Sequence, residues 1–188
     1  MPTKNVRACA GLGGPSASRP PRSLAGSKKA SELELGDTLL FPEVSAEGEV
    51  LELDELWSFV HRKSEKVWVW LALCRRTSQV VAFATGERSG ATCERLWRAL
   101  PEYYKGATCY SDFWEAYRGV IPGEQHEAAG KEQGETSHVE RWINTLRQRL
   151  SRFVRKTLSF SKSRYMHDCC LKLFIHRYNL ERRSIILE

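Results

Sequence analysis

The sequence predicts an α/β domain, a mixed five-stranded sheet flanked by helices, with a disordered segment before it. Two observations support this class. Three strand-like segments follow one another with short links, at 50–60, 67–74 and 79–85, which favours an antiparallel meander. A helical pattern at 89–104 then leads into a strand at 107–112, and such a crossover predicts a strand parallel to one of its neighbours.

The N-terminal quarter of the chain has a different composition. Residues 10–30 are rich in Gly, Pro, Ser and Ala without an apolar period, as in linkers and disordered segments. Segment 31–48 is polar and weakly patterned. We therefore expect a linker-like or disordered segment over 1–48 and a folded domain over 49–182. No signal peptide is expected, and the longest strongly apolar run is far below the roughly 20 residues of a membrane span.

The remaining elements follow from local patterns. FWEAY at 113–117 predicts a short helix, and 124–129 a weak edge strand. A long amphipathic helix is predicted by apolar residues at helical spacing, namely Val139, Trp142, Ile143, Leu146, Leu150, Phe153 and Val154. A last helix is expected over roughly 161–180.

Charge is concentrated at the C-terminal end. The chain has a net charge of +6, yet residues 136–188 alone carry twelve Lys or Arg and four Asp or Glu. Such an excess favours a polyanionic partner, either nucleic acid or an anionic membrane surface, against the ordinary alternative of a solvated basic face. The six cysteines form no CxxC motif and no zinc-like spacing, so we expect reduced thiols packed as small core residues.

Three isolated carboxylates occupy positions that each have an ordinary structural explanation. Asp54 lies within the apolar first strand and could face solvent at an edge. Asp112 ends a later strand and could cap the next helix. Glu140 lies in the first turn of the long helix and could close a capping box with Ser137.

The same three carboxylates could also meet. In a mixed sheet the middle of the first strand can lie beside the end of the fourth, with the first turn of a packed helix over the same point. The carboxylates would then repel one another and raise one another's pKa values. Two Mg²⁺ ions would relieve this repulsion and suit in-line displacement at phosphorus.

Three segments carry a resemblance to a known family, LDELWSFV (53–60), YSDFWEAY (110–117) and ETSHVERWINTLRQRLSRFVRKTLSFSKS (135–163). On these motifs, from about Glu52 to Asn179, the chain resembles the catalytic reading frame of the insertion-sequence-one family of transposases. The resemblance implies an RNase H-like fold and a DNA transposase of the Asp-Asp-Glu type. Such an enzyme cleaves DNA strands at the ends of an insertion element and transfers them to target DNA.

The family motifs place the triad residue by residue. The aspartate of the DELW motif falls on Asp54, that of SDFW on Asp112, and the glutamate of VERWINTLRQR on Glu140. The resemblance implies that these are the catalytic residues and that they hold two Mg²⁺ ions, with Mn²⁺ as a substitute. Related transposases often place a basic residue two turns after this glutamate, where Arg147 stands, and Asn144 lies one turn earlier on the same face.

The helix after Glu140 is expected to face DNA. Basic residues that could neutralise phosphates are Arg141, Arg147, Arg149, Arg152, Arg155 and Lys156. We expect DNA contacts from Asn144, Arg147, Arg149, Arg155 and Lys156, although an exposed helix position is the ordinary alternative for each. Trp57 and Trp114 could stack on a base, but core packing is the default. Ile143 departs from the polar residue expected at its position.

The resemblance also implies partners. Full-length members resemble a fusion with an N-terminal zinc-binding and helix-turn-helix part that recognises element ends, and nothing in residues 1–48 is similar to either. We expect an upstream-frame protein or fusion as partner, beside element-end and target DNA, with a homo-oligomer possible, in the cytoplasm at the nucleoid. The alternatives are an inactive or truncated DNA-binding partner that regulates a full-length transposase, and a general RNase H-like nuclease.

Overall fold

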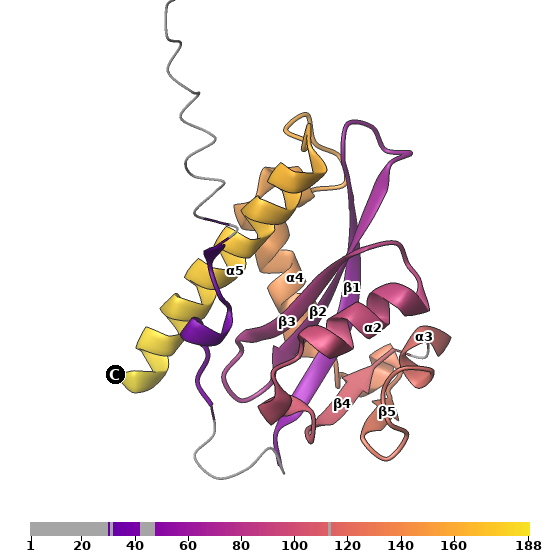
Figure 1. Cartoon of the computed structure of the whole chain (residues 1–188), viewed down its shortest axis with the longest axis vertical. Coiled ribbons are helices and arrows are strands. Elements are labelled where there is room, and N and C mark those ends of the chain that lie inside the picture. The colour runs from indigo at the N-terminus through magenta and orange to yellow at the C-terminus, as the bar shows by residue number, and fades with distance from the viewer. Residues whose placement is uncertain (1–29, 31, 42–47, 113) are drawn as a thin grey trace, which may run out of the picture.

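A five-stranded sheet with helices on both faces forms the centre of the protein (Figure 1). The computed structural model describes residues 30, 32–41, 48–112 and 114–188. The strands are β1 (Val50–Phe59), β2 (Lys66–Cys74), β3 (Val80–Gly86), β4 (Thr108–Ser111) and β5 (His126–Ala128). The α-helices are α2 (Gly90–Ala99), α3 (Glu115–Arg118), α4 (Ser137–Arg149) and α5 (Arg164–Leu187). Short 3-10 helices are η1 (Gly36–Thr38), η2 (Glu102–Tyr104), η3 (Lys131–Gln133) and η4 (Ser151–Phe153).

The strand order is β3-β2-β1-β4-β5, which makes β1 the central strand. The first three strands pair antiparallel, and Asp54 of β1 lies opposite Leu71 of β2. After the α2 crossover, β4 pairs parallel with β1, and β5 pairs parallel with β4. The predicted meander, parallel crossover and mixed five-stranded sheet are confirmed, and together they form the RNase H-like arrangement that the resemblance implies.

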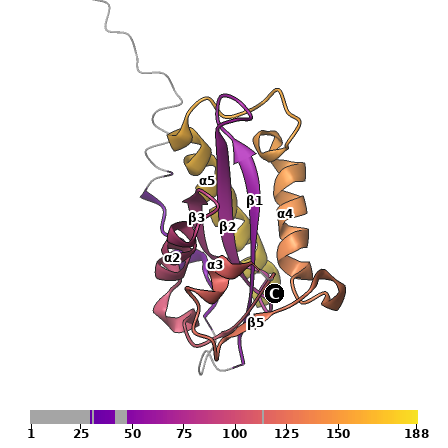
Figure 2. The ribbon, with the colours of Figure 1, turned by 90° about the vertical axis from the view of Figure 1, so that its right-hand side faces the viewer.

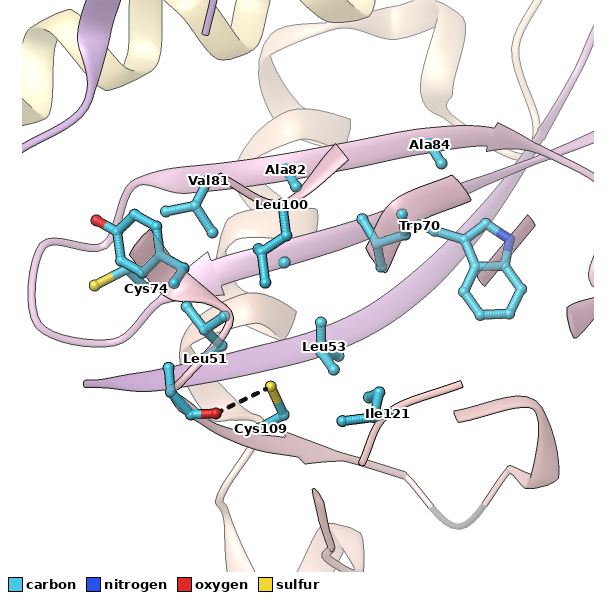
Figure 3. Packing of buried hydrophobic residues seen from close by; sticks show 14 of the residues in the cluster. Leu51, Leu53, Trp70, Cys74, Val81, Ala82, Ala84, Leu100, Cys109 and Ile121 are labelled. Atoms are coloured by element: carbon cyan, nitrogen blue, oxygen red, sulfur yellow. Dashed lines mark hydrogen bonds between the residues drawn. The ribbon is translucent and has the colours of Figure 1, made fainter. Parts of the chain in front are cut away.

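Each face of the sheet has its own core. Alternate residues of a strand point to opposite faces, so Leu51 and Leu53 of β1 pack toward α2, whereas Leu56 packs toward α4 and α5. Figure 3 shows the first core, in which Trp70 and Leu100 lie with these leucines. Figure 2 shows α2 and α4 on opposite sides of the strands. The central strand is therefore covered on both faces, which explains its long apolar sequence.

The long C-terminal amphipathic pattern folds differently from the prediction of one helix. α4 ends at Arg149, because Leu150 adopts an extended conformation with φ −122° and ψ 98°. The chain then turns through η4, and Phe153 is still fully buried, with its ring stacked 4.5 Å from that of His167. Phe153 thus reaches the core from a separate turn, and its helical spacing from Val139 was coincidental. α5 begins at Arg164 and continues past the predicted end at residue 180.

A segment before β1 also packs on the domain. Thr38 is fully buried, and the Gln79 side chain donates to the Thr38 carbonyl (2.9 Å) and accepts from the Leu40 amide (2.8 Å). Figure 1 shows this segment beside α5. The predicted division at residue 49 therefore leaves out residues that contact β3 and α5. The rest of the expected N-terminal segment, residues 1–29, 31 and 42–47, lies outside the described residues.

Among the described residues no two cysteines are joined by a disulfide, in line with the expected reduced thiols. Cys74, Cys93, Cys109 and Cys169 are buried and Cys170 is half-buried, so they serve as small packing residues. Across the described part of the chain, no helix is both long enough and apolar enough to cross a membrane.

Candidate active site

A cavity of about 380 Å³ opens where the pairing between β1 and β4 stops. These strands pair from Val50 to Glu52 of β1, and β4 ends at Ser111. The next residues along each strand therefore face the cavity. Asp54, Asp112 and Glu140 all line it, from β1, from the end of β4 and from α4.

Asp54 lies in an environment that disfavours its charged form. Its side chain points to the α4 face of the sheet, and its Oδ1 accepts the Glu55 amide at 2.7 Å. The pKa of Asp54 is raised from 3.8 to about 7, mainly by burial and also by the charges of Glu55, Asp112 and Glu140, against the lowering effect of the Glu55 amide bond. A half-buried carboxylate among other carboxylates is a group that a cation would stabilise.

Asp112 is positioned by a turn that directly follows β4. Its Oδ1 accepts the Trp114 amide at 3.1 Å, but Trp114 is itself the N-cap of α3, whose first turn has no side-chain cap bond. Asp112 therefore holds the turn ahead of the helix and lines the cavity, and the suggested role as helix cap is not observed. Ser111 anchors the strand end, because its hydroxyl donates to the Asp112 carbonyl (2.9 Å) and lies 2.7 Å from His126 Nε2 of β5.

Glu140 reaches the cavity from α4, and the suggested capping box with Ser137 does not form. The helix begins one residue earlier than that motif requires, with Thr136 as its N-cap, and the Thr136 hydroxyl donates to Glu140 at 3.5 Å. The amides of the first turn are instead bound by Glu52 of β1. The side chain of Glu140 is therefore not needed to cap the helix, and it lines the cavity.

The three carboxylates share one cavity, but they do not form a ready-made ligand group. Within the described ranges, no three His, Cys, Asp or Glu side chains are grouped closely enough to hold a metal ion. Hard divalent cations prefer oxygen ligands, which the three carboxylates supply. Such a cation would also stabilise the charged form of Asp54, whose pKa is raised.

The predicted DNA-contacting residues divide into two groups. Asn144, Arg147 and Arg155 line the cavity with the carboxylates. Arg149 lies outside it and forms an ion pair with Glu181 of α5 at 3.1 Å. Lys156 is exposed beyond η4 and also lies outside the cavity.

Arg147 has a distinctive environment. Its Nε is buried and has no hydrogen-bond partner among the residues that the structure describes. Burial and the nearby Arg155 lower the pKa of Arg147, whereas Asp54 raises it. A buried donor without a partner is costly. Arg147 is therefore suited to an anionic ligand that enters the cavity.

Ile143 is explained by packing. Its side chain is 5% exposed and belongs to the core between the sheet and α4, while also lining the cavity. An apolar residue therefore fits the place where a polar one was expected.

The wall opposite α4 was not predicted from the sequence. Arg88, in the connection from β3 to α2, lines the cavity beside Trp68. Its guanidinium lies 4.5 Å from the ring centroid of Trp114 and 5.0 Å from that of Trp68, and its Nε donates to Glu55 at 2.8 Å. The ring of Trp114 also packs on that of Trp70 at 5.0 Å. The place of Trp114 against the buried ring of Trp70 agrees with the default expectation that Trp114 packs on the core. No local pattern in the sequence pointed to Arg88, because its partners Glu55, Trp68 and Trp114 come from three separate segments.

The raised pKa of Asp54 predicts how the stability of the metal-free protein depends on pH. The folded protein holds this proton more tightly than the unfolded chain. The resulting stabilisation is full below pH 3.8 and is lost as the pH rises through about 7. With a metal chelator present, we expect the melting temperature of the wild type to fall between about pH 5 and about pH 8. The melting temperature of Asp54→Asn should fall less over the same range.

His167 acts in the opposite direction at acidic pH. Burial, with the charges of Arg164 and Arg152, lowers the pKa of His167 to about 4, so its effect is destabilising once the pH falls below 6.5. The wild type and Asp54→Asn both contain His167, so the effect of His167 cancels in the difference between their melting temperatures. Parallel pH profiles of the wild type and Asp54→Asn would contradict the raised pKa of Asp54.

Comparison with known proteins gives one consistent match. The family model of the IS1 transposase matches residues 49–181. The insertion element iso-IS1n protein InsB of Shigella dysenteriae is 36% identical over 129 residues, 69% of this chain and 95% of that protein. The IS1 protein InsB of Shigella flexneri is 37% identical over 130 residues, 69% of this chain and 94% of that protein. The IS1 4 protein InsB of Escherichia coli strain K12 is 36% identical over 130 residues, 69% of this chain and 74% of that protein.

Proposed function

Because this chain belongs to the IS1 transposase family, we propose that it is the catalytic part of a DNA transposase. In this proposal it cleaves a DNA strand at the end of an insertion element and joins the freed 3′-hydroxyl to target DNA. The observation that carries the proposal is the single cavity lined by Asp54, Asp112 and Glu140 at the open edge of β1.

The three carboxylates would hold the divalent cations, two Mg²⁺ ions for which Mn²⁺ can substitute. Support comes from their oxygen donors and from the raised pKa of Asp54, which a cation would lower again. When bound, such ions activate the attacking water or hydroxyl and stabilise the charge on the leaving oxygen. A bound cation would stabilise the charged form of Asp54, which burial disfavours.

The arginine side chains on the cavity walls would hold the DNA backbone. Arg147 and Arg155 lie on the α4 side, and Arg88 lies on the opposite wall. The half-buried guanidinium of Arg147, which lines the cavity, would donate to a phosphate oxygen. Contacts of this kind position the DNA and carry no sequence information. Recognition of element ends would then come from the upstream-frame partner or fusion, acting on chromosomal DNA in the cytoplasm.

Removing the Arg147 side chain should weaken DNA binding. We expect Arg147→Ala to raise the Kd for DNA about tenfold at low salt and to reduce the slope of log Kd against log salt by about 1. Fluorescence anisotropy over about 50–200 mM salt measures both quantities. Arg141→Ala is the matched control, because Arg141 is an exposed arginine of α4 outside the cavity. Equal effects of the two substitutions would contradict a phosphate contact at Arg147.

The direct test of the proposed function uses DNA that carries the ends of the chain's own insertion element. The purified chain, with the upstream-frame protein or as a fusion to it, is incubated with labelled duplex, target DNA and Mg²⁺ or Mn²⁺. We expect cleaved strands and strands joined to the target on denaturing gels. Cleavage without joining would favour a general nuclease. Absence of both products in the presence of the partner would contradict the proposal.

A further inference from the structure

Glu52 is a fully buried carboxylate on β1, two residues before Asp54 and on the same face of the sheet. Its Oε2 accepts the backbone amides of His138 (2.8 Å) and Val139 (3.0 Å) in the first turn of α4. These residues are more than eighty positions away along the chain. The first turn of α4 is therefore bound directly to the central strand.

The other oxygen of Glu52 extends this connection. Its Oε1 accepts Arg75 Nε at 2.7 Å and lies 2.7 Å from His138 Nδ1. Arg75 Nη2 also donates to the Glu135 carbonyl (2.6 Å) and carboxylate (2.8 Å), just before α4. The guanidinium lies 5.0 Å from the ring centroid of Tyr110 on β4. One network centred on the buried Glu52 thus joins β1, the residue after β2, β4 and the start of α4.

This network replaces a local helix cap. The first amides of a helix have no partner inside the helix, and a carboxylate near them also interacts favourably with the helix dipole. The N-cap residue Thr136 makes no side-chain cap bond in this protein. A buried carboxylate is tolerated only where it is paired and hydrogen-bonded, and Glu52 meets both conditions. The bonds from Glu52 therefore decide where the first turn of α4 lies on the sheet.

The same bonds lie next to the side chains that meet in the cavity. α4 runs beside β1 in the same direction (Figure 2). Glu52 binds α4 at His138 and Val139. On the strand, Asp54 lies two residues after Glu52, and on the helix, Glu140 directly follows Val139. Asp54 and Glu140 line one cavity.

We propose that Glu52 is a positioning residue that holds α4 so that Glu140 faces Asp54. This inference rests on the proposed function, because positioning matters for the reaction only if the two carboxylates act together. Glu52 itself does not touch the DNA in this role.

The test compares three variants. Glu52→Ala removes both acceptor oxygens. Glu52→Gln keeps one acceptor for the two amides but presents an N–H donor to Arg75. Glu49→Ala is the matched control, because Glu49 is 5% exposed, pairs with Arg76 (2.6 Å) and lies just before β1 without a hydrogen bond to α4. Three quantities are measured well below the melting temperatures, namely amide hydrogen exchange of residues 137–141, the Kd for DNA and the rate of strand cleavage.

We expect Glu52→Ala to speed exchange in the first turn of α4 and to slow cleavage about 100-fold, with the Kd for DNA nearly unchanged. Glu52→Gln should be intermediate in both exchange and rate, and Glu49→Ala should match the wild type in both. Exchange in Glu52→Ala equal to that in Glu49→Ala would overturn the inference, as would faster exchange with an unchanged cleavage rate. If the wild type cleaves no DNA, the proposed function fails, and this positioning role for the reaction fails with it. Hydrogen exchange would still report whether Glu52 holds the helix start.

Discussion

Asp112→Asn is expected to abolish DNA cleavage and strand joining, lowering the rate about 10³-fold or more, while the protein stays folded. The substitution removes one anionic oxygen from the cavity and with it several kcal/mol of transition-state stabilisation by the bound cations. Asparagine keeps an acceptor for the Trp114 amide, so the turn after β4 is preserved. The loss should therefore fall on the reaction rate, measured by single-turnover cleavage of element-end DNA.

The control for this experiment is Asp168→Asn on α5, where the carboxylate pairs with Arg164 outside the cavity. We expect it to retain wild-type activity. A divalent-ion titration adds a readout that does not depend on turnover, because a ligand that binds the folded state raises the melting temperature. Mg²⁺ should raise the melting temperature of the wild type and of Asp168→Asn more than the melting temperature of Asp112→Asn. Full activity of Asp112→Asn would rule out Asp112 as a catalytic residue.

Asn179→Leu is expected to give the largest loss of stability among the substitutions considered, about 2–4 kcal/mol. Asn179 is a fully buried polar residue of α5. Its side chain accepts the Val80 amide (3.0 Å) and donates to the Val80 carbonyl (2.8 Å), so it binds the free edge of β3 as a neighbouring strand would. Its Nδ2 also donates to Thr38 Oγ1 at 3.2 Å. Leucine has a similar volume but would leave these buried groups without partners.

Denaturant and thermal unfolding measure this prediction. A loss of this size lowers the melting temperature of a chain of this length by roughly 5–15 °C. Asn144→Leu is the matched control, because Asn144 is an exposed asparagine of α4, and surface changes are usually within about 0.5 kcal/mol. Similar losses in the two variants would show that the amide bonds to Val80 contribute little.

Short-range patterns were enough to predict most of the fold. The apolar runs of β1, β2 and β3, with short links between them, predicted the antiparallel meander. The helical crossover before β4 predicted its parallel pairing, since such connections leave few alternatives. The family motifs pointed to Asp54, Asp112 and Glu140, and the structure places all three in one cavity, although not as a ready-made ligand group. Their catalytic roles stay a prediction.

The amino-acid sequence by itself determined the order and type of the elements and the positions of the three carboxylates. Only the tertiary structure decided where α4 ends, how Glu52 binds its first turn, that Arg88 lines the opposite wall, and that Asn179 binds the edge of β3. Periodicity and capping motifs reflect interactions within one or two turns, or between neighbouring strands. The bonds of Glu52 and Asn179 instead join residues about ninety positions apart, and such pairings leave no local pattern because their partners meet only after the sheet and helices have packed.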